Sequence, residues 1–340
     1  MKRVLLIGPT PPPSGGIASH LDDLGRAAAE LGFETRRLGL PAKRVATQGA
    51  WRSGVRLARG MLWAQAHRAI VHLHTNGHNP GSWRLIACVT AVTSHRRLLL
   101  TIHSGLAPEF ILSQAAQCRR ALRPYRAIVG VSRTIVDALL AAGLEGDRLR
   151  LVPAFSAAAL PLPLQPAGWQ AIARVARPLL VAIVGHGAEY GTEALALGFA
   201  EIARRLPEAH LVILGAGARD PRSYVQLCAL DISHRIHRMG DLSRPEALGA
   251  LATADLLIRP SLTDGDALSI REALALGVRV VASDAVPRPP GVHTFPAGDP
   301  AALAAAACTA LLTPPWAPQT DAFFRPLFEL YRELPGEGAH

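Results

Sequence analysis

Short apolar runs alternate along the chain with longer segments that are apolar at helical spacing, which predicts β-strands alternating with α-helices. Four runs in the first half are almost continuously apolar, as in strands buried in a parallel sheet: residues 4–7, 70–74, 98–102 and 127–131. Three segments between and after them have helical spacing: residues 17–31, 82–94 and 133–140. We therefore predict an α/β domain over residues 1–160.

The same pattern returns in the second half of the chain. Residues 157–178 carry several prolines and are predicted to be a linker. Four apolar runs follow: residues 179–184, 210–214, 256–258 and 278–282. Helices are predicted over 192–206, from about Leu268, and after Asp299-Pro300, a typical helix start. This predicts a second α/β domain over residues 175–315, followed by a last helix over 320–334 within the segment 316–340.

The composition is that of a globular protein with excess positive charge. Apolar residues make up 49% of the chain and charged residues 18%, and the net charge is +10. Such an excess favours anionic substrates or surfaces. The sequence has no zinc-finger spacing or aromatic RNA-binding signature, so we expect no nucleic-acid partner.

The spacing of the cysteines and the length of the apolar runs bear on where in the cell the protein acts. The 4 cysteines form no CxxC pair, so the sequence indicates neither a zinc site nor a disulfide framework. The apolar run near the start is too short for a signal peptide, and no run reaches the ~18 residues of a membrane span. We therefore expect a cytoplasmic protein.

Residues 43–68 combine arginines with Trp51, Leu62 and Trp63 at spacings that suit an amphipathic helix. Such a helix can lie on an anionic membrane. More often, such a helix is a surface helix whose arginines extend over apolar neighbours. If the first reading holds, the protein acts at the inner face of the cell membrane.

A loop rich in Pro, Asp and Gly joins the predicted strand 256–258 to the helix that begins near Leu268. Asp264 and Glu272 stand eight positions apart across this junction. The amides of Gly265, Asp266, Ala267 and Leu268 lie between them, where a helix start has few internal acceptors and can face an anion. Two acids on either side of an anion site suit a nucleotide-diphosphate sugar, whose hydroxyls flank its phosphates. In the alternative interpretation, Asp264 and Asp266 are ordinary turn residues and Glu272 is a solvated helix residue.

This segment resembles the acidic signature of GT-B retaining glycosyltransferases of family 4. The matching residues are Pro260-Ser261, Asp264, Glu272-Ala273, Gly277 and Val280 to Ser283, with Asp264 in place of the usual Glu. The resemblance extends to the N-terminal stretch PPPSGGIASH and to the order of the elements. It implies two doubly wound Rossmann-like domains with an interdomain cleft, the acceptor bound by the first domain and the donor by the second. It also implies a C-terminal helix that crosses back to the first domain.

The resemblance also implies roles for particular residues. His103 would lie beside the donor sugar, and Gly15 and Gly16 would face the donor diphosphate. Related enzymes carry Arg and Lys where this chain has residues 186–191, with neither. Arg259 and Arg271 are the nearest replacements in sequence, unless they form salt bridges with Asp264, Asp266 or Asp284. The predicted catalytic residues are thus His103 and Asp264, and the predicted donor-binding residues are Gly15, Gly16, Arg259, Gly265, Asp266, Ala267, Leu268, Arg271 and Glu272.

We predict no metal site and no cofactor. His72, His74 and His78 are close in sequence, but no carboxylate accompanies them. The predicted function is transfer of a sugar from a nucleotide-diphosphate sugar to a glycan or lipid-linked acceptor, in cell-envelope polysaccharide synthesis. Two alternatives remain: a nucleotide-sugar epimerase or hydrolase of the same fold, and a degenerate, non-catalytic GT-B partner protein.

Overall fold

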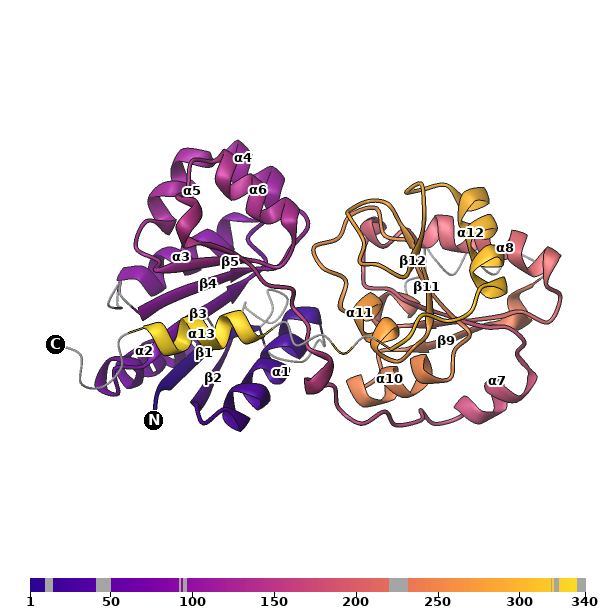
Figure 1. Ribbon diagram of the computed structural model, residues 1–340, viewed down its shortest axis with the longest axis horizontal. Coiled ribbons are helices and arrows are strands. Elements are labelled where there is room, and N and C mark those ends of the chain that lie inside the picture. Colours follow the sequence, from indigo (N-terminus) through magenta and orange to yellow (C-terminus); the bar gives the residue numbers. More distant parts are fainter. Residues whose placement is uncertain are drawn as a thin grey trace. The chain divides into compact units, whose positions relative to one another are not determined.

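The structure, a computed structural model, describes residues 1–9, 15–40, 50–91, 93, 97–219, 232–318, 320 and 324–334, without the side chains of 50–53. The chain divides into two compact units. Unit 1 is Met1–Ala159 with Asp321–His340, and unit 2 is Leu160–Thr320 (Figure 1).

Unit 1 is built on a six-stranded parallel sheet with the order β2-β1-β3-β4-β5-β6. Its strands are β1 (Arg3–Pro9), β2 (Glu34–Leu40), β3 (Ile70–Thr75), β4 (Leu98–Ile102), β5 (Ala127–Gly130) and β6 (Leu149–Leu151). Strands β2 and β3 flank β1 on opposite sides. The strand order therefore reverses between β1 and β3, and open α/β sheets bind ligands at the carboxyl ends of strands at such a point.

Helices cover both faces of this sheet because successive strand residues point to opposite sides. Leu5 and Ile7 face a core closed by five helices, α2 to α6. Val4 and Leu6 face a second core with α1 and α13. The helices of unit 1 are α1 (Gly16–Glu30), α2 (Ala50–Ala66), α3 (Pro80–Ala91), α4 (Ala107–Ser113), α5 (Ala115–Leu122), α6 (Arg133–Ala141) and α13 (Arg325–Glu333).

Helix α13 belongs to unit 1 although it follows unit 2 in the chain (Figure 1). Leu327, Phe328 and Tyr331 are buried in the core that contains Val4 and Leu6. The Tyr331 hydroxyl is 2.6 Å from His72 Nδ1 on β3. The second core of unit 1 therefore depends on a segment that lies beyond unit 2 in sequence.

Unit 2 has a second six-stranded parallel sheet, with the order β12-β11-β10-β7-β8-β9. Its strands are β7 (Leu179–Ile183), β8 (His210–Leu214), β9 (Ile236–Gly240), β10 (Leu256–Arg259), β11 (Arg279–Ser283) and β12 (Val292–Phe295). Its helices are α7 (Trp169–Val175), α8 (Thr192–Arg205), α10 (Arg244–Ala252), α11 (Leu268–Ala275) and α12 (Pro300–Leu312). Helices α8 and α12 pack on one face, and α7, α10 and α11 on the other.

The structure differs from the sequence prediction in two respects. The predicted linker 157–178 contains helix α7, whose Trp169 is fully buried in unit 2 and donates from Nε1 to Thr253 Oγ1 at 2.7 Å. Strands β2 and β12 and helices α4, α5 and α10 were not predicted. The Asp299 helix start is confirmed, since its carboxylate accepts from the amide of Ala302 at 2.9 Å.

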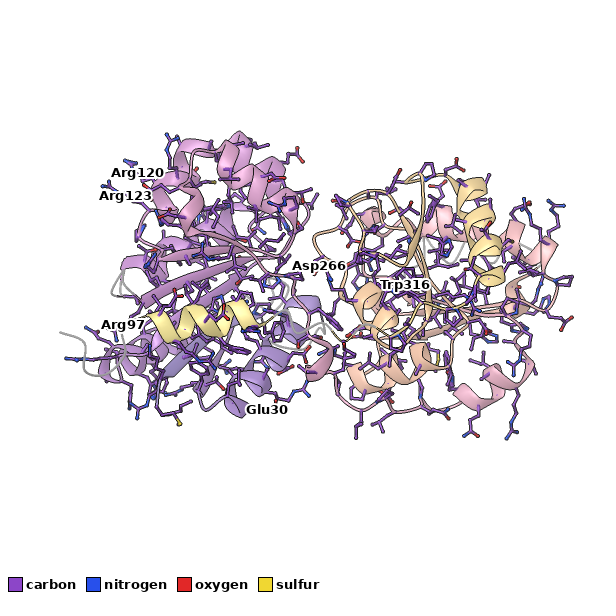
Figure 2. All side chains as sticks on the ribbon, in the orientation of Figure 1. Glu30, Arg97, Arg120, Arg123, Asp266 and Trp316 are labelled. Atoms are coloured by element: carbon purple, nitrogen blue, oxygen red, sulfur yellow. The ribbon has the colours of Figure 1, made fainter. Side chains whose placement is uncertain are left out.

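The basic segment near residue 50 folds as helix α2, with Met61 and Ala64 buried in the core of unit 1 and Leu62 65% exposed. Trp51 lies among the residues whose side chains are outside the described part. Among the described residues, no helix has both the length and the apolar character needed to span a bilayer. Exposed arginines such as Arg120 and Arg123 contribute to the positive charge of unit 1 (Figure 2). Cys88, Cys118 and Cys308 are free thiols, and Cys228 lies outside the described residues.

Candidate functional site

The acidic loop of unit 2 lies at the point where the strand order of its sheet reverses. Strands β7 and β10 are neighbours, and the chain continues from β7 toward β9 on one side and from β10 toward β12 on the other. The loops after β7 and β10 therefore meet at the carboxyl edge of the sheet. The amide of Leu262 donates to the carbonyl of Glu189 at 2.8 Å, which joins the two loops directly.

Glycines allow this close contact between the loops. Gly191 has a φ of +65°, and a Cβ there would lie 1.9 Å from the carbonyl oxygen of Pro260. A Cβ on Gly217, in the loop after β8, would meet the carbonyl oxygen of Gly185 at 1.9 Å. Both positions require glycine because backbone fills the space of any side chain. The loops after β7, β8 and β10 thus form one packed group.

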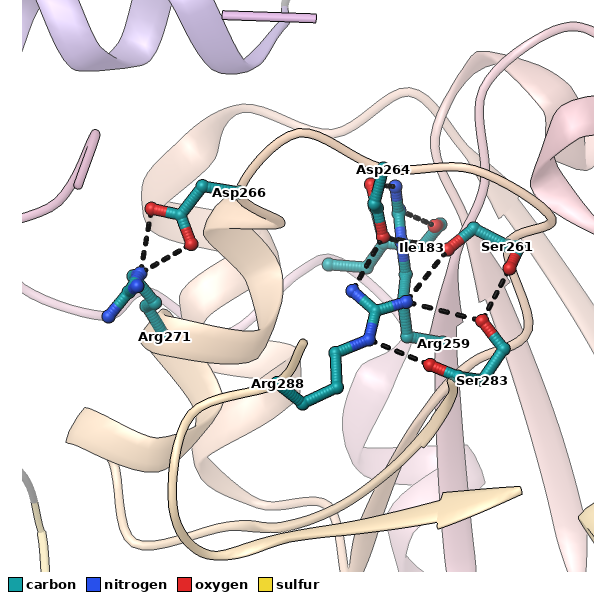
Figure 3. A network of polar contacts seen from close by, with 8 residues as sticks. All are labelled: Ile183, Arg259, Ser261, Asp264, Asp266, Arg271, Ser283 and Arg288. Carbon is teal, nitrogen blue, oxygen red and sulfur yellow. Dashed lines mark hydrogen bonds and ion pairs between the residues drawn. The ribbon is translucent and has the colours of Figure 1, made fainter. Parts of the chain in front are cut away.

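Asp264 is the centre of a buried polar network (Figure 3). Arg259 donates to both of its carboxylate oxygens, from Nη2 at 2.8 Å and from Nε at 3.2 Å. Arg288 Nη1 and Ser261 Oγ donate to Oδ2 at 3.0 and 2.7 Å. The network continues to Ser283, whose carbonyl accepts from Arg288 Nε at 2.7 Å. Asp264 is therefore held by charges and hydrogen bonds from three sides.

The charge state of Asp264 follows from this network. Burial alone would raise the pKa of the carboxyl group. The charge of Arg259 and its hydrogen bonds, with further contributions from Arg288 and Ser261, outweigh burial and lower the pKa to about 2. Asp264 is ionised at neutral pH.

The two other acids of the loop and helix also pair with arginines. Asp266 accepts from Arg271 Nε at 2.6 and 2.7 Å (Figure 3). Glu272, which is buried on α11, accepts from Arg244 Nε at the start of α10 at 2.8 Å. The reading of Glu272 as a solvated helix residue is wrong, and the salt-bridge reading of Arg259 and Arg271 describes their observed contacts.

The amides expected to face an anion lie where the sequence indicated. Helix α11 begins at Leu268 with Ala267 as its N-cap, and Gly265 and Asp266 precede it in the loop. The first amides of a helix have no acceptor within it. Two ion pairs lie beside the segment from Gly265 to Leu268. Asp266, within the segment, pairs with Arg271, and Glu272, further along the helix, pairs with Arg244.

Loop 185–191 contributes an aromatic ring to the network. The guanidinium carbon of Arg259 lies 5.2 Å from the ring centroid of Tyr190. A Cβ on Gly185 would lie 2.4 Å from a ring carbon of Tyr190, so this glycine makes room for the ring. Loop 185–191 therefore supports an arginine that comes from β10.

The predicted glycines of unit 1 lie at the start of helix α1. Gly15 is the N-cap with a φ of −164°, and Gly16 is the first helical residue. Neither has a positive φ, so the reading of a tight turn that requires glycine is wrong. A Cβ on either would meet no atom within 4 Å. Both residues are exposed.

His103 follows β4 and belongs to a group of imidazoles. Its Nε2 lies 3.2 Å from His74 Nδ1 on β3, and His20 of α1 packs against both rings. His78, considered with His72 and His74 from sequence, instead has its Nδ1 2.8 Å from Ser104 Oγ. The histidines that meet are therefore not the three that are close in sequence.

Three residues of these sites were missed from sequence. Arg244 lies 28 positions before Glu272, and Arg288 lies 24 positions after Asp264. His20 ends the stretch PPPSGGIASH, where only the glycines were singled out. The order of parallel strands could have indicated His20, because the element after β1 and the end of β3 meet at the same edge.

Part of unit 2 matches a known protein family. Residues 177–313 match the family model described as glycosyl transferases group 1, which covers unit 2 from β7 to α12. None of the curated proteins matches the sequence at a significant level.

Solved structures match nearly the whole chain. HepE from Anabaena, in complex with UDP and glucose, is 16% identical with a TM-score of 0.67 over 92% of this chain and 90% of that chain. Sucrose-phosphate synthase from Thermosynechococcus elongatus is 18% identical with a TM-score of 0.67 over 98% and 95%. Trehalose-6-phosphate synthase OtsA is 13% identical with a TM-score of 0.66 over 92% and 92%.

At these identities the structural neighbours show the fold alone. The expected fold class is confirmed: two units, each with a parallel six-stranded sheet and helices on both faces, as in GT-B proteins. The chain has the GT-B fold, and its second unit matches group 1 glycosyl transferases over residues 177–313.

Proposed function

We propose that the protein is a glycosyltransferase that moves a sugar from a nucleotide-diphosphate sugar to an acceptor. The observation that carries the proposal is the grouping of three acid–arginine pairs at the point where the sheet order of unit 2 reverses, inside the segment that matches group 1 glycosyl transferases. Ligands of open α/β sheets bind at this position. HepE, of the same fold, binds UDP and glucose.

In this proposal the donor binds to unit 2. Glu272, on helix α11, accepts from the ribose hydroxyls. The amides of Gly265, Asp266, Ala267 and Leu268 and the guanidinium of Arg271 hold the diphosphate. Charge that develops on the leaving phosphate is stabilised by fixed amides and cations, which need no rearrangement during the reaction.

Arg244 supplies part of the positive charge that residues 186–191 lack. Its side chain is 16% exposed and its Nε contacts Glu272 at 2.8 Å, next to the proposed ribose site. Arg259 is less suited, because its guanidinium is engaged with Asp264 and with the carbonyl of Ile183 at 3.1 Å. We therefore propose that Arg259 positions Asp264 and does not bind the donor.

The remaining roles follow the family 4 resemblance. His103 hydrogen-bonds the transferred sugar, Asp264 contacts or orients it, and Gly15 and Gly16 face the diphosphate. Transfer retains the anomeric configuration and is independent of metal ions. The acceptor is a glycan or lipid-linked molecule of the cell envelope that binds to unit 1, and the exposed residues of helix α2 contact an anionic membrane.

A second candidate function has a specific observation in its favour. Both oxygens of Asp264 already accept hydrogen bonds, and Asp266 and Glu272 each have an arginine partner. Such a site can be complete without a substrate. A nucleotide-binding partner protein without transfer activity would have this arrangement.

A donor screen tests the proposal. The full chain is titrated calorimetrically with UDP, GDP and ADP, and then incubated with the matching radiolabelled sugars and membrane glycolipid acceptors. We expect one diphosphate to bind and its sugar to appear on the acceptor. Binding without any product would favour the non-catalytic partner, and an altered or free sugar without acceptor would favour the epimerase or hydrolase. The absence of binding by all three diphosphates would refute the proposal.

A further inference from the structure

Three histidines from separate segments of unit 1 meet at the carboxyl edge of its sheet. His20 lies on α1, His74 near the end of β3, and His103 just after β4. Each offers one ring nitrogen, and these nitrogens all lie within 4.8 Å of one another. This histidine cluster stands where the strand order of unit 1 reverses, between β1 and β3.

The spacing of the rings suits a shared metal ion. The ring centroids form a triangle with sides of 5.2 Å for His20–His74, 5.1 Å for His20–His103 and 5.5 Å for His74–His103. Three imidazoles bound to one tetrahedral zinc ion at ~2.0–2.1 Å would have centroids about 5 Å apart. The distances between the rings are therefore compatible with one shared ion.

The nitrogen atoms of His74 support the same conclusion. Its Nδ1 lies 3.2 Å from His103 Nε2, within hydrogen-bond distance. Its Nε2 is buried and has no hydrogen-bond partner among the residues that the structure describes. A buried polar atom without a partner is uncommon in folded proteins. A cation bound at Nε2 would give this nitrogen a partner.

His72 shows how a histidine without this role is satisfied in the same core. Its Nδ1 lies 2.6 Å from the Tyr331 hydroxyl and its Nε2 lies 2.7 Å from Thr101 Oγ1. Both of its nitrogens are therefore engaged with neutral groups. His72 supports the ring of His74, whose centroid is 4.0 Å away, and is not available to a metal.

His74 and His103 lie among other imidazoles and near one arginine. Burial and neighbouring imidazoles hold the pKa values of His74 and His103 well below the usual value. Arg37 is the cation whose charge also lowers the pKa of His74, and it forms an ion pair with Asp22.

From this geometry we propose that His20, His74 and His103 bind one divalent d-block cation of the zinc class. Three imidazole ligands select such ions over Mg²⁺ and Ca²⁺, which prefer oxygen ligands. Three protein ligands also leave a fourth position open to water or another small ligand. His103 is partly exposed, so the ion has access from that side. Metal binding to the histidine cluster can be measured without the proposed glycosyl transfer, but the cluster shares His103 with the proposed sugar site. We assign no metal to the diphosphate.

Cobalt binding to the untagged full chain tests this proposal. The protein is freed of metal with a chelator and titrated with Co²⁺, whose visible absorption distinguishes four-coordinate from six-coordinate ions. We expect one Co²⁺ per chain with a four-coordinate spectrum, displaced by Zn²⁺ and not by Mg²⁺. The variants His103→Ala and His20→Gln should each weaken Co²⁺ binding at least tenfold.

A matched control comes from unit 2. His210 and His237 form a stacked pair with nitrogens 2.8 Å apart, and no third histidine, cysteine or acid joins them among the described metal-binding groups. The variant His237→Ala should bind Co²⁺ as the unmodified chain does. If His20→Gln fails to fold, His103→Ala still decides the question, because His103 is partly exposed. Equal affinity in His103→Ala and the unmodified chain, or a six-coordinate spectrum, would show that the histidine cluster is only a packed group of rings.

Discussion

Arg259 and Asp264 form a two-point contact in which Nη2 and Nε of the arginine donate to the two oxygens of the carboxylate, at 2.8 and 3.2 Å. The side chains are only 12% and 7% exposed, so the pair is largely removed from water. We propose that Asp264 contacts or orients the transferred sugar. Its contacts mean that it also holds together strand β10 and the loop that follows, and substitutions must be read for stability as well as for activity.

Replacing Asp264 with asparagine should destabilise unit 2. The amide keeps the size of the side chain but leaves Arg259 and Arg288 buried without their counter-charge. Loss of one partner of a buried ion pair typically costs about 3–5 kcal/mol. Calorimetric unfolding of the variant should show this loss. Asp299→Ala is a suitable control, because it removes only a helix cap, at a cost of about 1 kcal/mol. Equal effects of the two substitutions would contradict a buried network at Asp264.

Asp264→Asn should also separate the two proposed roles in the enzyme. If the carboxylate contacts or orients the transferred sugar, turnover falls far more than affinity for the nucleoside diphosphate. Both quantities are measured below the unfolding temperature of the variant. An equal loss of turnover and diphosphate affinity would remove Asp264 from the sugar site.

The pH dependence of stability should show the ionisation of Asp264. Its pKa in the folded protein is about 2, below the ~3.9 of an unfolded chain, so the folded state favours the charged form. The stabilisation is fully present above about pH 4 and is lost as the pH falls from there through 2. Urea unfolding of the unmodified protein and of Asp264→Asn should therefore differ by a constant amount above pH 4. The difference should shrink at lower pH, and a constant difference down to pH 2.5 would contradict the assignment.

The two arginines first expected to bind the diphosphate should behave differently. Arg271→Ala should lower diphosphate-sugar affinity or turnover at least tenfold, about 1.4 kcal/mol, and change thermal unfolding little. Arg259→Ala should instead lower the unfolding temperature, because Asp264 loses its bidentate partner. Calorimetry with the nucleoside diphosphate and a thermal scan of each variant measure both effects. Full activity in Arg271→Ala would move the compensating charge to Arg244 or to unit 1.

Substitution of Glu272 tests the proposed nucleotide site directly. Glu272→Ala should weaken nucleoside diphosphate binding by roughly 1–3 kcal/mol, the range for loss of a charged hydrogen bond. Part of this loss can come from Arg244, whose partner is removed. Arg244→Ala serves as the comparison, since it leaves the carboxylate in place. An unchanged dissociation constant in Glu272→Ala, measured by calorimetry, would exclude Glu272 from the ribose site.

Elements with a simple apolar pattern could be predicted from sequence, and elements at the sheet edges could not. The buried strands β1, β3, β4, β7, β8 and β10 read as apolar runs because both of their faces are covered. Edge strand β2 has the sequence ETRRLGL and only half-buried or exposed residues, so it gives no such signal. Helix α7 follows a group of prolines, so the sequence predicts a linker there, although Trp169 is buried in the core of unit 2.

The candidate site shows the same limit at the level of side chains. The acid spacing from Asp264 to Glu272 lies within one strand–loop–helix unit, so local sequence locates it. The arginine partners Arg244 and Arg288 come from other loops and become neighbours only through the parallel order of the strands. The histidine cluster likewise depends on three segments spread over more than 80 positions. Sequence could indicate the candidate donor loop but not the charges that surround it.

The position of helix α13 has a consequence for synthesis of the chain. The ribosome completes the strands of unit 1 and then all of unit 2 before the residues of α13 emerge. During that time the stripe of Leu6, Leu99 and Val129 lacks part of its cover, since Phe328 and Tyr331 have not yet been made. Domains usually fold in order from the N-terminus as they are synthesised. In this chain, unit 1 is synthesised first but completes its second core only after unit 2 has been made. A nascent chain that stalls within unit 2 would expose apolar residues of unit 1 to chaperones.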